Sequence, residues 1–328
     1  MPNLRAGIIG LGMMGANHAR VLSNLEGVDL VAVVDPQGDA IKVLPKFNVL
    51  KSIEELIEIG VDYCIISAPT SFHEQIALNL IDKRIHFLVE KPIADSYISA
   101  QRICSAAKFA NVIGAVGHIE RFNSALQEAR KRVLAGELGV IHQVATSRQG
   151  PFPARISDVG VVKDLATHDI DLTSWLTGKK YLHVSANASF RSGRQFEDLI
   201  AVSGMLENSI VVSHLVNWLS PVKERKIVIT GERGTFVVDT LRANLIYYEA
   251  GIVNISQLDQ TNLYEMTQGE VRILDFEKPE PLHVEHKNFR DAVLGKDSNI
   301  VTLDEGAITV KIAEAIIESY STKSQIML

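Results

Sequence analysis

The sequence predicts an α/β protein with two domains. The first is an N-terminal doubly wound parallel sheet, and the second is a C-terminal α+β domain with an open, mostly antiparallel sheet. Residues 1–120 alternate apolar strand-like runs with helical segments, as successive βαβ units do. A glycine-rich turn follows the first run. After residue 136, strand-like runs follow one another with little helix between them, which is typical of antiparallel sheets.

The first domain is predicted from apolar periodicity and from residues that begin or end helices. The run at 28–35 is continuously apolar up to Asp35, as in a strand buried on both faces. Ser52 and Glu55 form a capping box for a helix, and Ser96 begins another. We expect strands at 5–10, 28–35, 62–69, 86–92 and 112–119, with helices at 13–25, after 52, at 71–84 and at 96–111.

The second domain is predicted because strand-like runs follow one another there with little helix between them. Runs such as YLHVSANASF, SIVVSHLVNWL and RKIVITGERG are separated by turn-like breaks. A helix at 122–135 precedes them, and two helices follow, at 282–295 and 302–320. We therefore expect a cofactor domain at 1–120 and a domain for substrate binding and oligomerisation at 121–328.

Composition excludes several classes of protein. The 328 residues carry a net charge of −6, with 46% hydrophobic and 22% charged residues. Nucleic acids and anionic membranes both require clustered Lys and Arg, which a diffuse acidic balance does not supply. No apolar run reaches the roughly 18 residues that span a bilayer. Cys64 and Cys104 lie in apolar runs, which predicts buried free thiols and a cytoplasmic protein.

The glycine-rich turn predicts a dinucleotide site. Gly10, Gly12 and Gly15 have the spacing G-x-G-x-x-G between a strand and a helix. In such a turn the glycines allow a tight bend, close approach of a pyrophosphate and helix–strand packing, and the phosphates meet the helix N-terminus. Asp35 ends the second strand, where a carboxylate binds the ribose diol and repels a 2′-phosphate. Because no Arg or Lys follows directly, NAD is expected rather than NADP.

Lys91 lies at the end of a strand, before Pro92. In an open α/β sheet the carboxyl ends of the strands are where ligands bind, so the strand end directs Lys91 toward that crevice. An ordinary solvated lysine is the alternative.

The segment GVVKDLATHDID (160–171) concentrates polar groups on a predicted helix. Asp164, His168 and Asp171 would share one face at i, i+4 and i+7, and a carboxylate one turn before an imidazole raises its basicity. That arrangement suits a general base. There are two alternatives. One is an Mg²⁺ site formed by Asp164, Asp169 and Asp171, and the other is a solvent-exposed polar face of the helix. No His/Cys cluster stands at metal-ligand spacing, so no metal is expected.

These motifs together resemble the Gfo/Idh/MocA family of glucose–fructose oxidoreductase and inositol dehydrogenase. The resemblance runs over nearly the whole chain. It is carried by the glycine loop with Asn17-His18 behind it, Ala68-Pro69-Thr70 with His73, Glu90-Lys91-Pro92, and the pattern from Gly160 through Asp164 to His168-Asp169.

The resemblance implies a Rossmann domain followed by an open, mostly antiparallel sheet through which members pair into dimers or tetramers. It implies Lys91, Asp164 and His168 as the catalytic trio. Expected cofactor-binding residues are Gly10, Gly12, Met13, Met14, Gly15, Asp35, Ala68, Pro69, Thr70, His73, Glu90 and Lys91.

Two stretches, GHIERFN (117–123) and RQGPFPARISDVG (148–160), narrow the resemblance to members that act on a nucleotide sugar. A diphosphate needs donors, and guanidinium groups match phosphate oxygens well. Arg121, Arg148 and Arg155, with Asn123, are therefore expected to bind substrate together with Asp164 and His168. An ion pair at the surface or between domains is the alternative for each arginine.

The resemblance implies oxidation of a secondary hydroxyl of a sugar, at C3 of a UDP-N-acetylhexosamine, with hydride transfer to NAD. His168 would remove the hydroxyl proton, Asp164 would orient His168, and Lys91 would donate a hydrogen bond to the alkoxide, with the Lys and His roles open to exchange. Three alternatives stay open: a dehydrogenase of free polyols such as inositol, an NAD-dependent glycosidase, and a non-enzymatic NAD-bound regulator.

Overall fold

The computed structural model describes residues 2–38, 49–153, 159–251 and 268–328. The chain forms two compact units, the first made of residues 1–122 and 279–314 and the second of residues 123–278 and 315–328. The division at residue 122 lies close to the boundary expected near 120. Residues 279–314, however, were assigned to the second domain and belong to the first unit. Periodicity identified their helices but carries no information about which sheet they cover.

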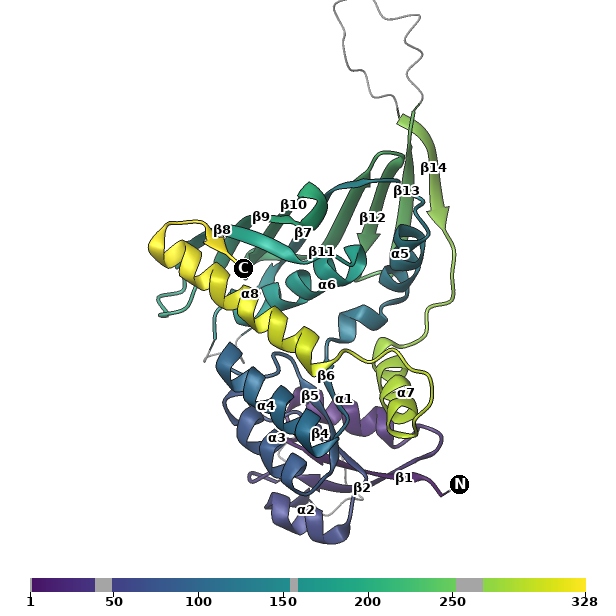
Figure 1. Cartoon of the computed structure of the whole chain (residues 1–328), viewed down its shortest axis with the longest axis vertical. Helices are drawn as coiled ribbons and strands as arrows, with labels where there is room; N and C mark the ends of the chain where they lie inside the picture. Colours follow the sequence, from purple (N-terminus) through teal and green to yellow (C-terminus); the bar gives the residue numbers. More distant parts are fainter. Residues whose placement is uncertain (1, 39–48, 154–158, 252–267) are drawn as a thin grey trace, which may run out of the picture. The chain divides into compact units, whose positions relative to one another are not determined.

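The first unit contains a six-stranded parallel sheet, as predicted (Figure 1). In spatial order its strands are β3 (Val49–Leu50), β2 (Val28–Val34), β1 (Leu4–Ile9), β4 (Tyr63–Ile66), β5 (His86–Glu90) and β6 (Gly114–Gly117). Only the two-residue β3 was not predicted. The chain order reverses between β1 and β4, and a doubly wound sheet binds its ligands at such a switch point.

Helices cover both faces of this sheet. They are α1 (Met13–Leu22), α2 (Ile53–Ile59), α3 (His73–Asp82), α4 (Tyr97–Ala110), α7 (Pro281–Val293) and the first part of α8 (Leu303–Thr322), with short 3₁₀ turns η1 (Thr70–Phe72) and η2 (Ile119–Phe122). One core cluster joins α3 and α4 to the sheet. The other includes Phe289 of α7, whose ring meets that of Tyr63 edge-on at 5.4 Å. Residues 279–314 thus complete the core of this unit.

The second unit is built on a nine-stranded sheet. In spatial order its strands are β14 (Gln268–Leu274), β13 (Asn244–Ala250), β12 (Gly234–Asp239), β11 (Leu219–Gly231), β7 (Ile141–Pro151), β10 (Ile210–Asn217), β9 (Leu199–Leu206), β8 (Tyr181–Ser189) and β15 (Ile326–Met327). The pairing is antiparallel except between β7 and β10, which run parallel. The predicted mostly antiparallel sheet is therefore confirmed.

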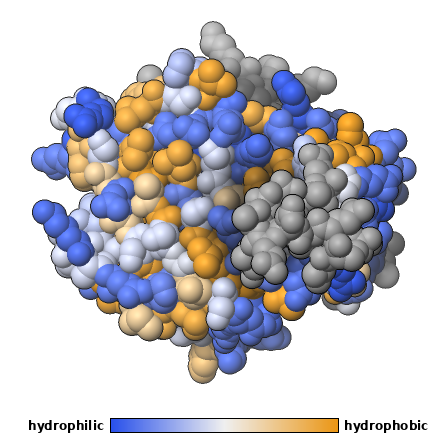
Figure 2. Space-filling view, turned by 90° about the horizontal axis from the view of Figure 1, so that it is seen from above, coloured by the Kyte–Doolittle hydropathy of each residue, from blue (hydrophilic) through white to orange (hydrophobic). Residues whose placement is uncertain are grey.

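One face of this sheet is covered by helices, and no helix of the described residues covers the other. The covering elements are α5 (Ser124–Leu134), the π turn η3 (Val162–Ala166) and α6 (Thr167–Thr177). Along β10, Val212 and Val216 are buried, whereas Val211 and Leu215 are exposed, as alternation along a strand requires. Exposed hydrophobic side chains lie among polar ones on the face seen in Figure 2.

Two sequence expectations concern the chain as a whole. Cys64 and Cys104 are free thiols, as predicted, although Cys104 is only half-buried. Among the helices of the described residues, none has both the length and the apolar character needed to cross a bilayer.

Candidate active site

The glycine loop has the geometry that a dinucleotide requires. Gly10 has a φ of +95°, and a Cβ there would lie 2.6 Å from the backbone nitrogen of Ala68. A Cβ at Gly15 would lie 2.0 Å from the carbonyl oxygen of Gly10. Among the described residues nothing lies within 4 Å of a Cβ built on Gly12, and α1 begins there without a side-chain cap. The loop therefore leaves open backbone at a helix N-terminus, which suits a pyrophosphate.

Asp35 lies directly after β2 and is joined to this loop. Its Oδ2 accepts a hydrogen bond from the backbone N–H of Leu11 at 2.8 Å, and its Oδ1 accepts one from Gln37 at 2.8 Å. The carboxylate is half-buried, so its direction is set by two backbone donors while lone pairs remain for a ribose diol. These residues fit NAD.

The segment after β4 is held by contacts that the sequence analysis did not find. Ser67 donates from Oγ to the carbonyl of Gly10 at 2.7 Å and so joins the loop to β4. Ala68, Pro69 and Thr70 follow at the carboxyl end of the strand. His73 is buried, with Nε2 2.9 Å from the carbonyl of Ala68 and Nδ1 2.9 Å from that of Pro92. The structure therefore gives His73 two backbone carbonyls as partners.

Glu90 ends β5 and precedes Lys91. Its Oε1 lies 2.9 Å from Nε2 of His18 on α1, and its Oε2 accepts a hydrogen bond from the backbone N–H of Lys91 at 3.2 Å. Lys91 is half-buried and directly follows the last residue of β5.

In the second unit, the helix that carries Asp164 and His168 begins at a buried carboxylate. Glu197, 4% exposed, accepts a hydrogen bond from the backbone N–H of Val162 at 2.9 Å. A Cβ at Gly160 would lie 2.1 Å from Oε1 of Glu197. The glycine is thus required by close packing against the carboxylate that begins the helix.

The first turn of this helix is a π turn, η3, where an α-helix was predicted. The wider turn adds one residue to the hydrogen-bonded ring, and such turns frequently occur at functional sites. The expected common face of Asp164, His168 and Asp171 is therefore altered. Asp164 and His168 are half-buried, whereas Asp171 is buried.

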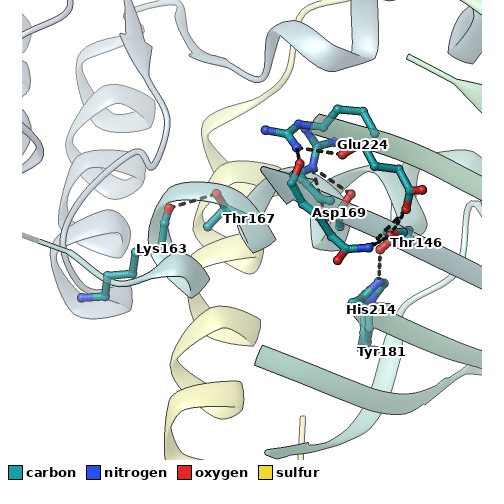
Figure 3. A network of polar contacts seen from close by, with 11 residues as sticks. Thr146, Lys163, Thr167, Asp169, Tyr181, His214 and Glu224 are labelled. Carbon is teal, nitrogen blue, oxygen red and sulfur yellow. Dashed lines mark hydrogen bonds and ion pairs between the residues drawn. The ribbon is translucent and has the colours of Figure 1, made fainter. Parts of the chain in front are cut away.

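The next residue, Asp169, joins the helix to the sheet (Figure 3). Its two carboxylate oxygens each lie 3.1 Å from Nε of Arg148 on β7, and both side chains are almost fully buried. On the same face of the sheet, His214 lies between Thr146 and Tyr181, with 2.8 Å from each ring nitrogen to its partner oxygen. Burial lowers the pKa of His214 to about 4.

Three of the predicted substrate-binding residues have partners within the protein. Arg148 binds Asp169, and Arg121 binds Glu305 at 2.7 Å, so both have the ion pairs that were the alternative to phosphate binding. Asn123 begins α5, accepting from the N–H of Ala125 at 3.1 Å. Arg155 lies outside the described residues.

Metal binding was raised as an alternative for Asp164, Asp169 and Asp171. Within the described ranges, no group of three or more His, Cys, Asp and Glu side chains is arranged to hold a metal ion. Asp169 has a guanidinium partner, which already balances its charge.

Sequence reasoning missed Ser67, Glu197, His214 and the partner of Asp169. Ser67 had a signal, because it lies at the carboxyl end of a predicted strand next to the switch point. Glu197 and His214 had none, because their partners come from other elements of the sheet.

Two family models match the chain. Residues 4–118 match the model described as an oxidoreductase family with an NAD-binding Rossmann fold, and residues 126–237 match the Gfo/Idh/MocA C-terminal domain. Together they cover more than half of the sequence. The chain belongs to the Gfo/Idh/MocA family of oxidoreductases, and its first unit carries the family's NAD-binding domain. The resemblance drawn from the motifs and the expected cofactor are thus confirmed.

Named relatives differ in substrate. The chain is 31% identical over 194 residues to scyllo-inositol 2-dehydrogenase (NAD(+)) of Bacillus subtilis, covering 56% of this chain and 57% of that one. It is 32% identical over 189 residues to UDP-N-acetylglucosamine 3-dehydrogenase of Acidithiobacillus ferrooxidans, covering 57% and 58%. These alignments span little more than half of either relative. A solved structure of the latter enzyme matches with a TM-score of 0.86 at 25% identity, covering 98% and 99%.

Proposed function

We propose that this protein oxidises a secondary hydroxyl of a sugar with NAD, and that the preferred substrate is a UDP-N-acetylhexosamine oxidised at C3. The observation that carries the reaction class is the open backbone at Gly12 beside Asp35, in a chain of this oxidoreductase family. The nucleotide-sugar assignment is supported by the likeness to UDP-N-acetylglucosamine 3-dehydrogenase over 98% of the chain.

Lys91, Asp164 and His168 are proposed to carry the proton chemistry. His168 takes the proton of the substrate hydroxyl, Asp164 favours the protonated imidazole, and Lys91 donates a hydrogen bond to the oxygen as it becomes negative. Bound NAD supplies the hydride acceptor. Support for these roles comes from the family motif and from the half-buried state of all three side chains.

Oxidation of a free polyol is the second candidate. It is favoured by the ion pairs of Arg121 and Arg148, because a guanidinium bound to a carboxylate is a weaker phosphate ligand. The similarity to scyllo-inositol 2-dehydrogenase supports the same reading.

We further propose that the protein is a homodimer or homotetramer assembled through the open face of the second sheet. Support comes from exposed apolar side chains on β10 and β14, among them Val211, Leu215, Val271 and Ile273. Light scattering of the purified protein tests this, and a monomer at micromolar concentration contradicts it.

The experiment that separates the substrates follows formation of reduced nicotinamide by absorbance. UDP-N-acetylglucosamine, free N-acetylglucosamine, myo-inositol and scyllo-inositol are compared at equal concentration. Oxidation of the UDP-sugar alone supports the nucleotide-sugar assignment, equal rates on the free sugar contradict it, and oxidation of an inositol alone favours the polyol candidate. Activity on none of the four contradicts the proposed reaction.

The residue assignments are tested in the same assay. Lys91→Ala and His168→Ala are expected to lower the single-turnover rate by about 10²–10⁴-fold, as loss of a general acid or base does, and to leave NAD affinity nearly unchanged. The wild-type rate should rise with pH through the imidazole range and lose this dependence in His168→Ala. A single-turnover rate near wild type in either variant refutes that residue's role.

A further inference from the structure

A chain of buried polar side chains lies next to Lys91 in the first unit. It is made of Glu90 at the end of β5, His18 on α1 and His286 on α7, with Glu285 beside His286. None of the four is more than 9% exposed. Buried titratable groups in such number are unusual in a core, because burying them is unfavourable unless they are paired.

The contacts in this chain are short and continuous. Glu90 Oε1 lies 2.9 Å from His18 Nε2, and His18 Nδ1 lies 2.8 Å from His286 Nε2. The two imidazole rings meet at 89°, with their centres 4.9 Å apart. Since Glu90 also accepts from the backbone of Lys91, hydrogen bonds connect Lys91 to α7.

The charges of these groups follow from their surroundings. Burial opposes ionisation of Glu90, but the hydrogen bond and charge of His18, together with the charge of Lys91, lower its pKa below the ordinary value. Burial, with His18 and His283, lowers the pKa of His286 well below its usual range.

Two further groups interact with Glu90. Burial, with the charge of Glu90, raises the pKa of Glu285 well above its usual value. Burial also lowers the pKa of His73, although the charge of Glu90 acts in the opposite direction. These surroundings therefore favour the ionised form of Glu90, the protonated form of Glu285 and the neutral imidazoles of His286 and His73.

The hydrogen-bonded cluster of Glu90, His18 and His286 can accept one proton without losing a hydrogen bond. In one form His286 donates from Nε2 to His18, and His18 donates from Nε2 to Glu90. A proton added at Nδ1 of His286 lets the Nε2 proton move to His18, which becomes an imidazolium beside the Glu90 carboxylate. Within the described part of the chain, Nδ1 of His286 is buried and has no hydrogen-bond partner, so a proton added there would displace no existing hydrogen bond.

We propose that His18 and His286 are positioning residues that act on Lys91 through Glu90, by binding and releasing one proton in each catalytic cycle. The inference rests on the proposed function, because it concerns Lys91 as a catalytic group. In the oxidation, the carbinol carbon gives a hydride to NAD, and the hydroxyl proton goes to His168, as proposed above. The buried cluster takes its one proton from solvent and returns it to solvent within the same turnover, so the cluster is unchanged after each turnover and the charge facing Lys91 is restored.

His286→Gln separates proton binding from hydrogen bonding. The glutamine amide can still donate to His18 near the position of Nε2, but it has no second nitrogen that takes a proton. His286→Leu removes both properties. His142→Gln is the matched control, because it makes the same substitution at an exposed histidine of the second unit.

We expect His286→Gln and His286→Leu to lower kcat roughly tenfold, less than loss of a group that touches substrate, and to alter the dependence of kcat on pH. KM for NAD and the thermal midpoint of His286→Gln should stay near wild type, and His142→Gln should match wild type throughout. A His286→Gln enzyme with wild-type kcat at every pH overturns the inference.

Two measurements separate this inference from the proposed function. If Lys91→Ala is inactive while His286→Gln is normal, only the inference fails; if Lys91→Ala is fully active, the catalytic assignment fails and the inference with it. Nitrogen NMR of labelled histidines needs no substrate: proton uptake should leave the His286 proton on Nδ1 instead of Nε2, so the signals of its two ring nitrogens should change with pH in the wild type. Signals of His286 that stay constant from about pH 5 to about pH 9 also overturn the inference.

Discussion

Replacing Asp169 with asparagine removes one charge from a buried pair while nearly preserving the shape of the side chain. Asp169 lies on α6, one residue after His168, and Arg148 lies on β7 beneath it, with both oxygens of the carboxylate 3.1 Å from the guanidinium Nε. The substitution therefore leaves the Arg148 cation in the core without its counter-charge.

The expected loss is large because both side chains are at most 3% exposed. Breaking one partner of a buried pair typically lowers stability by about 3–5 kcal/mol. With an m-value of about 2 kcal/mol/M in urea, the unfolding midpoint of the second unit should fall by about 1.5–2.5 M. In the double variant Arg148→Met/Asp169→Leu we expect most of the loss to be recovered, because apolar residues remove both buried charges.

Fluorescence makes the assay specific to one unit. The chain has two tryptophans, Trp175 and Trp218, and both lie in the second unit. Urea titrations followed by tryptophan emission thus report the unit that contains the pair. The control is Lys131→Gln, because Lys131 is exposed and its 3.8 Å contact with Glu128 should contribute nothing measurable. An Asp169→Asn midpoint equal to that of the control would refute the reasoning.

Three further predictions follow from single contacts. Calorimetry should find tighter binding of NAD than of NADP, and Asp35→Ser should lose that discrimination; equal affinities in the wild type would count against the role of Asp35. His214 stays neutral in the core, so the unfolded state binds its proton more readily, and folding stability should fall as pH drops from about 6.5 to about 4, by up to about 3 kcal/mol; urea titrations of His214→Asn should show a shallower decline, and an equal decline contradicts this. Gly160→Ala places a Cβ 2.1 Å from Glu197 and should lower the tryptophan-monitored midpoint, whereas an unchanged midpoint would mean that Glu197 moves freely.

The sequence alone was sufficient to predict features that have a periodic or positional pattern along the chain. Alternating strands and helices, the glycine spacing and Asp35 at a strand end each have a periodic or positional signature. The π turn at Val162–Ala166 has none, because one extra residue in a hydrogen-bonded ring leaves the apolar pattern of the helix almost unchanged.

The same reasoning could not predict contacts between side chains that are distant in sequence. Arg148 was expected to bind a diphosphate because its guanidinium suits phosphate, and the pattern gave no sign that Asp169 would lie opposite it in the core. His18 and His286 are separated by most of the chain. Only folding brings such groups together, and local periodicity does not encode those distances.

The return of residues 279–314 to the first unit has a consequence for synthesis on the ribosome. The N-terminal strands emerge first, yet Phe289, Leu303 and Val310, which complete their core, are translated only after nearly all of the second unit. At typical translation rates this interval is on the order of ten seconds or more. During it the nascent sheet exposes apolar surface that α7 and α8 later cover, which is the kind of surface that chaperones bind. The second unit meanwhile has the opportunity to fold before the first is finished.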